Sequence, residues 1–127
     1  MAWETSEFRG DSVYSIECTG DACTGDEVAF DRAKFSGSFR NARFAGFERV
    51  EAVIVSESYG AAKQQHTFTL KLADGSITRI KGRNLYAQGL YRKPWQNEAD
   101  RLRVLAEKHN RGDIARAERR SRMEYVL

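Results

Sequence analysis

The most informative stretch of the sequence for chemistry combines cations with aromatic side chains. Lys81, Arg83 and Asn84 surround Gly82, where an unhindered backbone can approach an anion, although the glycine could instead serve a turn. Guanidinium and ammonium groups neutralise phosphates, aromatic rings stack on bases, and an amide can read a base edge. The residues that we predict to bind phosphate or nucleic acid here are Arg79, Lys81, Arg83, Asn84, Tyr86, Arg92 and Lys93.

A second stretch mixes the same residue types closer to the N-terminus. It holds Phe35, Phe39, Arg40, Arg43, Phe44 and Phe47. Its phenylalanines could stack on bases, or Phe35, Phe44 and Phe47 could be core residues, as could Trp95, with neighbours that point to solvent. We favour the core interpretation.

Histidine and cysteine offer little for catalysis or metal binding. His66 follows two glutamines, which makes it a candidate for hydrogen bonding to a ligand, whereas His109 is typical of a core or capping histidine. Cys18 and Cys23 lie in a tandem Cys-Thr-Gly-Asp repeat rich in turn formers, so we place them in a surface loop. Because no second pair of soft ligands is near them, we predict no metal and no cofactor.

The common signatures of enzymes do not occur in this sequence. It contains neither a Walker A sequence nor Gly-x-Gly-x-x-Gly after a strand, and no arrangement of nucleophile and base stands out. We therefore predict no catalytic residues. A small enzyme that uses His66 is our third hypothesis.

Hydrophobic periodicity indicates an antiparallel meander in the middle of the chain. We expect strands at 25–35, 47–58, 67–72, 77–80 and 90–93. The segment 36–46 reads as a long excursion, and a further loop opens at Tyr59 and ends near Gln65. Asp74-Gly75 is a hairpin signal, and 83–86 reads as a compact turn.

This order of elements resembles the SH3-like small barrels of the Tudor and KOW type over residues 25–95. The cues are Gly25-Asp26 before the first strand, Asp74-Gly75 in the last hairpin, and a short helical turn from Arg83 to Gln88. The resemblance implies an α+β fold, a small antiparallel SH3-like β-barrel with a C-terminal helical extension. This superfold hosts unrelated functions, so it does not identify one.

The end of the chain has the spacing of helices. Asn97 is the expected N-cap of a helix whose Leu102 and Leu105 pack on the barrel. We expect a break at 110–112 and a second, arginine-rich helix after Asp113 that a partner orders. Three of its residues, Arg116, Arg119 and Arg120, extend the predicted phosphate-binding set.

Composition and charge bound the class of protein. The 127 residues are 41% hydrophobic and 31% charged, which suits one small core. Residues 1–32 carry eight acidic and two basic side chains, and the rest carries ten acidic and nineteen basic ones. We divide the chain into an acidic N-terminal segment (1–24), the barrel (25–95) and a basic helical extension (96–127). No apolar run could span a bilayer, and we expect a cytoplasmic location without membrane partners.

The sequence supports two main functional hypotheses. The first is a nonenzymatic binding module for nucleic acid or a nucleoprotein complex, such as a phage or mobile-element accessory or inhibitor protein. The second is an oligomeric receptor for a nucleotide or another phosphorylated small ligand, held by the 81–86 turn and His66. An acidic protein is a further partner that the basic surface could bind.

Overall fold

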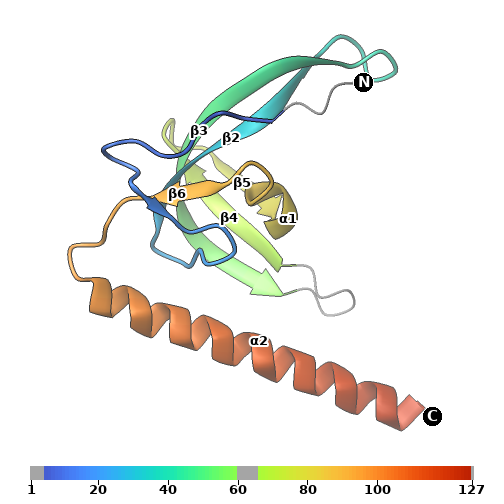
Figure 1. Cartoon of the computed structure of the whole chain (residues 1–127). Coiled ribbons are helices and arrows are strands. Elements are labelled where there is room, and N and C mark those ends of the chain that lie inside the picture. The colour runs from blue at the N-terminus through green and yellow to red at the C-terminus, as the bar shows by residue number, and fades with distance from the viewer. Residues whose placement is uncertain (1–4, 60–65, 127) are drawn as a thin grey trace.

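The strands of this chain form a single antiparallel sheet with a long helix at its end, an α+β architecture (Figure 1). The computed structural model describes residues 5–59 and 66–126. The strands are β1 (Ile16–Glu17), β2 (Glu27–Ser36), β3 (Arg43–Tyr59), β4 (His66–Leu72), β5 (Ile77–Lys81) and β6 (Leu90–Arg92). The helices are α1 (Gly82–Leu85) and α2 (Glu98–Val126). In the sheet the strand order is β1-β6-β2-β3-β4-β5.

The predicted strands and the β4–β5 hairpin are confirmed. Along β4, Phe68 and Leu70 alternate with half-buried or exposed residues, because successive side chains of a strand point to opposite faces. The hairpin turns at Asp74-Gly75, where Gly75 has a φ of 89°. The loop predicted from Tyr59 to Gln65 falls on residues 60–65, which lie outside the described residues.

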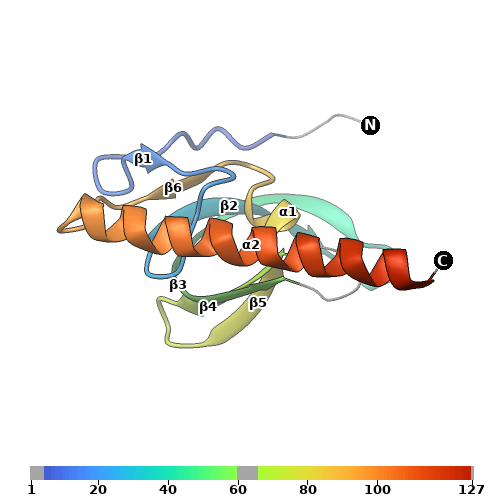
Figure 2. The ribbon, with the colours of Figure 1, turned by 90° about the horizontal axis from the view of Figure 1, so that it is seen from below.

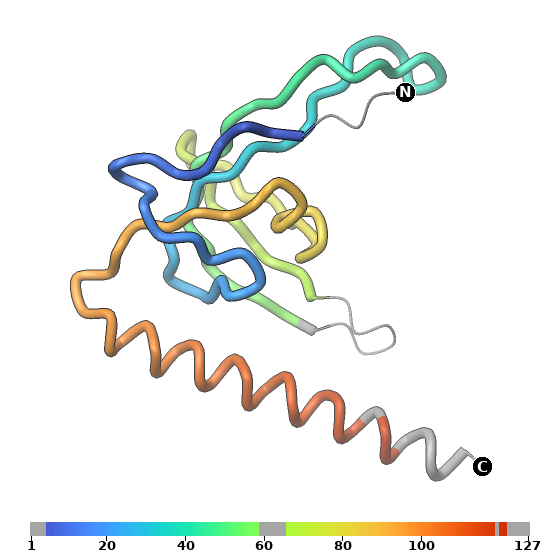
Figure 3. The backbone as a smooth tube through the Cα atoms, viewed as in Figure 1, coloured from blue at the N-terminus to red at the C-terminus, as the bar shows by residue number. Residues whose placement is uncertain are grey.

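The excursion predicted at 36–46 is shorter than expected, because β2 continues to Ser36, β3 begins at Arg43, and residues 37–42 alone connect the two strands of a hairpin. Phe35 pairs with Phe44, past a bulge after Ala33. β2 pairs with β6 no further than Phe30, so the rest of the hairpin extends beyond the other strands as a two-stranded ribbon (Figure 3). The glycines and arginines of this segment made its strand pattern hard to recognise in the sequence. Its aromatic side chains lie on a two-stranded ribbon that solvent reaches.

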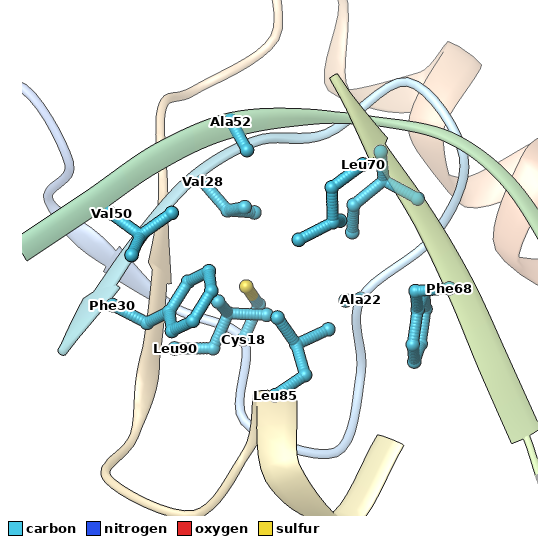
Figure 4. Packing of buried hydrophobic residues seen from close by; sticks show 11 residues of the cluster. Cys18, Ala22, Val28, Phe30, Val50, Ala52, Phe68, Leu70, Leu85 and Leu90 are labelled. Carbon is cyan, nitrogen blue, oxygen red and sulfur yellow. The ribbon is translucent and has the colours of Figure 1, made fainter. Parts of the chain in front are cut away.

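The core combines side chains from the sheet, α1 and the N-terminal segment (Figure 4). Its largest fully buried side chains include Phe30, Ile54, Phe68, Leu85 and Leu90. Cys18 and Ala22 also belong to this cluster. The described part of the acidic segment thus folds onto the sheet. The predicted loop is confirmed, with Thr19, Gly20 and Asp21 exposed, but both cysteines in it are free and buried.

Helix α2 begins as predicted, but it is one continuous helix. The side chain of Asn97 accepts a hydrogen bond from the backbone N–H of Ala99, so Asn97 caps the helix. The expected break at 110–112 is wrong. Gly112 lies inside the helix and is buried, one helical turn after Lys108. The propensity cost of a glycine, about 1 kcal/mol, is too small to end the helix.

The face of α2 that packs on the body is not the predicted leucine stripe. Leu102 is 64% exposed and Leu105 is half-buried, whereas Arg101 and Lys108 are only 5% exposed. Arg101 and Lys108 are seven residues apart and therefore lie on the same side of the helix. In Figure 2, α2 crosses the body and its C-terminal part continues past it.

Arg101 binds a fully buried carboxylate, that of Asp26. Its Nε and Nη2 atoms lie 2.8 and 2.9 Å from the two carboxylate oxygens of Asp26. The indole N–H of Trp95 and the backbone N–H of Cys23 donate to the same carboxylate, at 2.7 and 3.0 Å. This bidentate pair attaches α2 to the start of β2.

Lys108 makes the second buried attachment of α2, to Glu57 near the end of β3. The ammonium lies 3.5 Å from the Glu57 carboxylate, donates a hydrogen bond to the carbonyl of Ala22, and sits over the Phe68 ring. Burial alone would raise the pKa of Glu57, but the hydrogen bond with His66 and the charge of Lys108 hold it below its ordinary value. Glu57 is therefore ionised when the helix is attached.

We predict that α2 depends on the Asp26–Arg101 pair more than on any exposed pair of the helix. Arg101→Leu leaves a buried carboxylate without its cation and should lower the free energy of unfolding by about 3–5 kcal/mol. Arg103→Leu is the matched control, because Arg103 is exposed and pairs with Asp100 at the surface, which should cost at most about 1 kcal/mol. Urea unfolding measures both; equal midpoints would contradict the prediction.

We also predict that both cysteines resist thiol reagents in the folded protein. Burial, with the charge of Asp26, raises the pKa of both thiols to about 12. The reactive thiolate is then scarce at pH values well below 12. A colorimetric disulfide reagent should label neither thiol at mildly alkaline pH until urea unfolds the chain. Rapid labelling of either cysteine before unfolding would contradict the burial of that residue.

Candidate nucleic-acid interface

The cations of β5 lie on the solvent-exposed face of the sheet. Ile80 packs toward the core opposite Phe68, so its neighbours Arg79 and Lys81 point the other way and are exposed. Arg79 pairs with Thr69 of β4, and Lys81 pairs with Thr67. Because β5 ends the strand order, these two cations line an open edge of the sheet.

Helix α1 follows β5 directly and extends this group. Arg83 and Asn84 are exposed, while Leu85 is fully buried and holds the helix on the core. We call Arg79, Lys81, Arg83 and Asn84 the basic edge. Among the described residues, none of its three cations has a carboxylate partner. Their charge is therefore available to an anion in solution.

Gly82 is buried at the start of α1, which leaves little of its backbone for an anion to approach. A Cβ built there would lie 3.5 Å from the His66 carbonyl oxygen and 3.6 Å from the Phe68 ring, which are ordinary van der Waals distances. Cations on either side of it remain exposed.

Three residues of the predicted set have structural partners instead. Arg92 is 6% exposed and its guanidinium forms two hydrogen bonds to Glu98, which removes it from the phosphate-binding set. The Tyr86 hydroxyl accepts a hydrogen bond from the backbone N–H of Ala22, and burial raises the pKa of that phenol. Lys93 lies 3.6 Å from Glu27 and over the ring of Tyr14.

His66 belongs to the attachment of α2. Its Nε2 atom lies 2.8 Å from Glu57 Oε1, its side chain is 17% exposed, and its ring lies 4.2 Å from that of Phe68. The predicted contact between His66 and a ligand stays a prediction, but the structure places the imidazole in a contact that orients Glu57.

The predicted arginines of the C-terminal extension lie on α2, whereas the basic edge lies on β5 and α1, as the element labels of Figure 1 show. Arg116 and Arg120 are exposed, and Arg116 pairs with Asp113 one turn before it. Arg119 lies in α2, but its side chain is outside the described part of the structure.

Two groups of exposed residues were missed or misjudged from the sequence. Once Phe68 and Leu70 face the core, Thr67, Thr69 and Lys71 must point to the opposite face of the sheet, where the threonines are half-buried and Lys71 is exposed, so the alternation of β4 already contained this information. The core interpretation is wrong for Phe35 and Phe44, which are 65% and 40% exposed on the β2–β3 hairpin. Phe39, on the same hairpin, is 101% exposed.

The model of the domain of unknown function DUF7699 matches residues 18–95, and the chain belongs to this family. The matched range contains the core from Cys18 to β6 and ends at Trp95, before α2. The basic edge lies inside it.

One curated relative adds context. The zinc finger CCCH domain-containing protein 62 of Oryza sativa subsp. japonica is 37% identical over 127 residues, covering 89% of this chain and 18% of that protein. The chain thus spans less than a fifth of the relative's length. No solved structure matches it significantly.

Residues 5–59 and 66–126 show neither a cluster suited to a metal ion nor a helix suited to a membrane. Within these ranges no three or more His, Cys, Asp and Glu side chains gather as a metal ion would require. The helices described there are too short or too polar to cross a bilayer.

The Arg92–Glu98 pair predicts a pH dependence of stability. The two hydrogen bonds from Arg92, with one from the backbone N–H of Trp95, lower the pKa of Glu98 from 4.5 to about 2. A depressed carboxyl pKa stabilises the fold above pH 4.5, and this contribution is lost as the pH falls toward about 2. Glu98→Gln should therefore destabilise the fold at neutral pH and lower its melting temperature. Because the ion pair is half-exposed, the free energy of unfolding should fall by at most about 1 kcal/mol.

Thermal unfolding of the parent and Glu98→Gln across a pH series measures this. The difference between the two proteins should shrink as the pH falls below 4.5 and vanish near 2. A difference that does not depend on pH would contradict the ionic role of Glu98.

Proposed function

We propose that this chain is a nonenzymatic binding module for nucleic acid, in which the basic edge holds phosphates. The observation that carries the proposal is the basic edge itself, where Arg79, Lys81 and Arg83 are exposed within five residues and lack carboxylate partners among the described residues. Thr67 and Thr69 lie opposite Lys81 and Arg79 and offer hydroxyl donors beside them. Phosphate contacts by such groups supply most of nonspecific affinity for nucleic acid.

Several cations elsewhere in the chain contrast with those of the basic edge. Arg32, Arg49, Arg92 and Arg101 each pair with a carboxylate, and Lys108 reaches Glu57. Solubility alone does not require that the cations at one edge of the sheet lack acidic neighbours. Cations on an edge strand also prevent pairing with another sheet. That role does not require Arg83 or Asn84, which lie beyond the strand.

The competing hypothesis of a receptor for a phosphorylated small ligand has less support. A pocket of about 310 Å³ opens beside Tyr14 and Lys71, but Glu27 and Glu51 also line it. A second pocket, of about 330 Å³, opens beside Lys93 and Trp95, and Glu27 and Asp100 line it. Two carboxylates make a poor phosphate site because like charges repel, so these two pockets give a nucleotide less support than the basic edge gives to extended phosphate contact.

We also propose that β2 to β6 form an SH3-like barrel. In support, β2 to β5 make a meander, the short helix α1 follows, and β6 returns to pair with β2. This is the order of elements that the sequence resembled. In this interpretation α2 and β1 are additions to the barrel.

The name of the rice relative is consistent with the proposal. That name states a CCCH zinc finger, and zinc fingers are among the modules that recognise nucleic acids. A phage or mobile-element role stays a prediction of the sequence.

We expect binding to labelled DNA and RNA at low salt that weakens steeply as salt is added. The double variant Lys81→Gln/Arg83→Gln should bind more weakly, and the slope of log affinity against log salt on duplex DNA should fall by about 0.9 for each phosphate that the variant no longer neutralises. Asn84→Ala should change affinity or selectivity and leave the slope unchanged, since an amide carries no charge. Fluorescence anisotropy across a salt series measures all three.

Arg103→Gln/Arg111→Gln is the matched control, because it removes the same charge from exposed positions of α2. It should bind nearly as the parent does. If the parent binds no nucleic acid at low salt, or if the two double variants behave alike, the basic edge is not the interface. An acidic protein partner would then be the alternative to test.

A further inference from the structure

The tip of the β2–β3 hairpin is the most unusual surface of the chain. Residues 33–47 contain four phenylalanines, Lys34, Arg40 and Arg43, and no acidic residue. We call this segment the hairpin tip. It lies beyond the point where β2 leaves β6, so no other strand of the described residues covers it.

The rings of the hairpin tip form a connected aromatic cluster that solvent reaches. Phe35 and Phe44 pair directly across the strands, with ring centroids 6.2 Å apart and an edge-to-face orientation. Phe44 contacts Phe47 in the same way at 5.2 Å. Cross-strand aromatic pairs stabilise a hairpin, so these three rings have a structural role.

Phe39 has no such structural role. It lies at the turn and is fully exposed, at 101% of its reference area, and it takes part in none of the ring contacts of the tip. With Phe35 and Phe44 it gathers exposed apolar surface on one hairpin, and such a gathered surface marks a contact site for a partner. Arg40 follows it immediately and is exposed.

The charges of the hairpin identify the chemistry of that partner. At the base of the ribbon, Arg32 pairs with Glu48 and Arg49 pairs with Asp31. At the tip, Lys34, Arg40 and Arg43 are exposed and have no carboxylate partner among the described residues. A ligand that matches both the exposed ring and the exposed cations carries flat aromatic groups and negative charges that alternate at short intervals. Single-stranded nucleic acid has these properties.

We propose that the hairpin tip is a stacking platform for the bases of single-stranded nucleic acid, with Phe39 as its principal ring. Lys34, Arg40 and Arg43 hold the phosphates beside the stacked bases. Duplex buries its bases between neighbouring pairs and cannot offer these faces, so the tip selects single strands. This inference rests on the proposed function for the class of ligand, but it concerns a different surface.

The test compares Phe39→Ala, Phe39→Leu and Phe39→Trp with the parent on labelled oligothymidylate and on a duplex of equal length. Losing one stacked base should weaken single-strand binding by about 5- to 150-fold. Phe39→Leu keeps an apolar side chain without a π face, so it should lose affinity as Phe39→Ala does, and Phe39→Trp should retain it. Duplex affinity and the salt slope should stay as in the parent.

Val13→Ala is the matched control, since Val13 is also a large exposed apolar residue, but on a different element. All of these variants should melt as the parent does, because neither side chain is buried. Thermal unfolding checks this before binding is compared.

The outcomes separate the two proposals. If the parent binds nucleic acid through the basic edge but Phe39→Ala binds single strands as the parent does, the stacking platform is wrong and the proposed function stands. If Phe39→Leu keeps the parent's affinity, the contact is apolar and not stacking, which also overturns the inference. If Phe39→Ala changes self-association alone, the tip binds a second copy instead. If the parent binds no nucleic acid, both proposals fail.

Discussion

The arrangement of this chain depends on one fully buried carboxylate. Asp26 accepts hydrogen bonds from the backbone of Cys23, the indole of Trp95 and the guanidinium of Arg101, so it joins the N-terminal loop, the segment after β6 and α2. An isolated ionised carboxylate in such a place would cost several kcal/mol, whereas here each oxygen is satisfied. The loop that contains both cysteines is closed by the same carboxylate, which explains why Cys23 is buried in a segment rich in turn formers.

Hydrophobic periodicity was sufficient to predict the strands, but it was not sufficient to predict which face of α2 packs on the body. Alternation along β4 and the Asp74-Gly75 turn are local signals, and both were correct because each depends on neighbours in the chain. The packed face of α2 depends on Asp26 and Glu57, which lie far from it in sequence. Rules of hydrophobic spacing select leucines, but here the apolar stems of Arg101 and Lys108 cross the packed surface to reach buried acids. No pattern within the helix itself distinguishes these two cations from its exposed ones.

Prediction of the candidate site was limited in the same way. Arg79, Lys81 and Arg83 could be placed at the surface, because strand alternation and a short turn fix their directions. Arg92 could not be separated from them, since its burial depends on Glu98 reaching back from the first turn of α2. The phenylalanines of the hairpin were assigned to the core because aromatic residues usually are buried. What overrides that rule is topology: β6 is three residues long and ends its pairing at Phe30 of β2.

The charge division of the sequence acquires a physical meaning once these pairs are known. Three acidic residues of the first part of the chain pair with cations: Asp26 with Arg101, Asp31 with Arg49, and Glu27 near Lys93. Exposed cations without a carboxylate partner among the described residues lie at the basic edge and at the hairpin tip, and others, such as Arg111 and Arg120, lie on α2. β3 is the one strand that joins the basic edge to the hairpin tip, because it pairs with β2 in the hairpin and with β4 beside the edge. Its 17 residues extend on the order of 50 Å. A single strand that stacks at one end and meets phosphate-binding cations at the other must therefore cover several nucleotides, so affinity should rise with oligonucleotide length until both surfaces are reached.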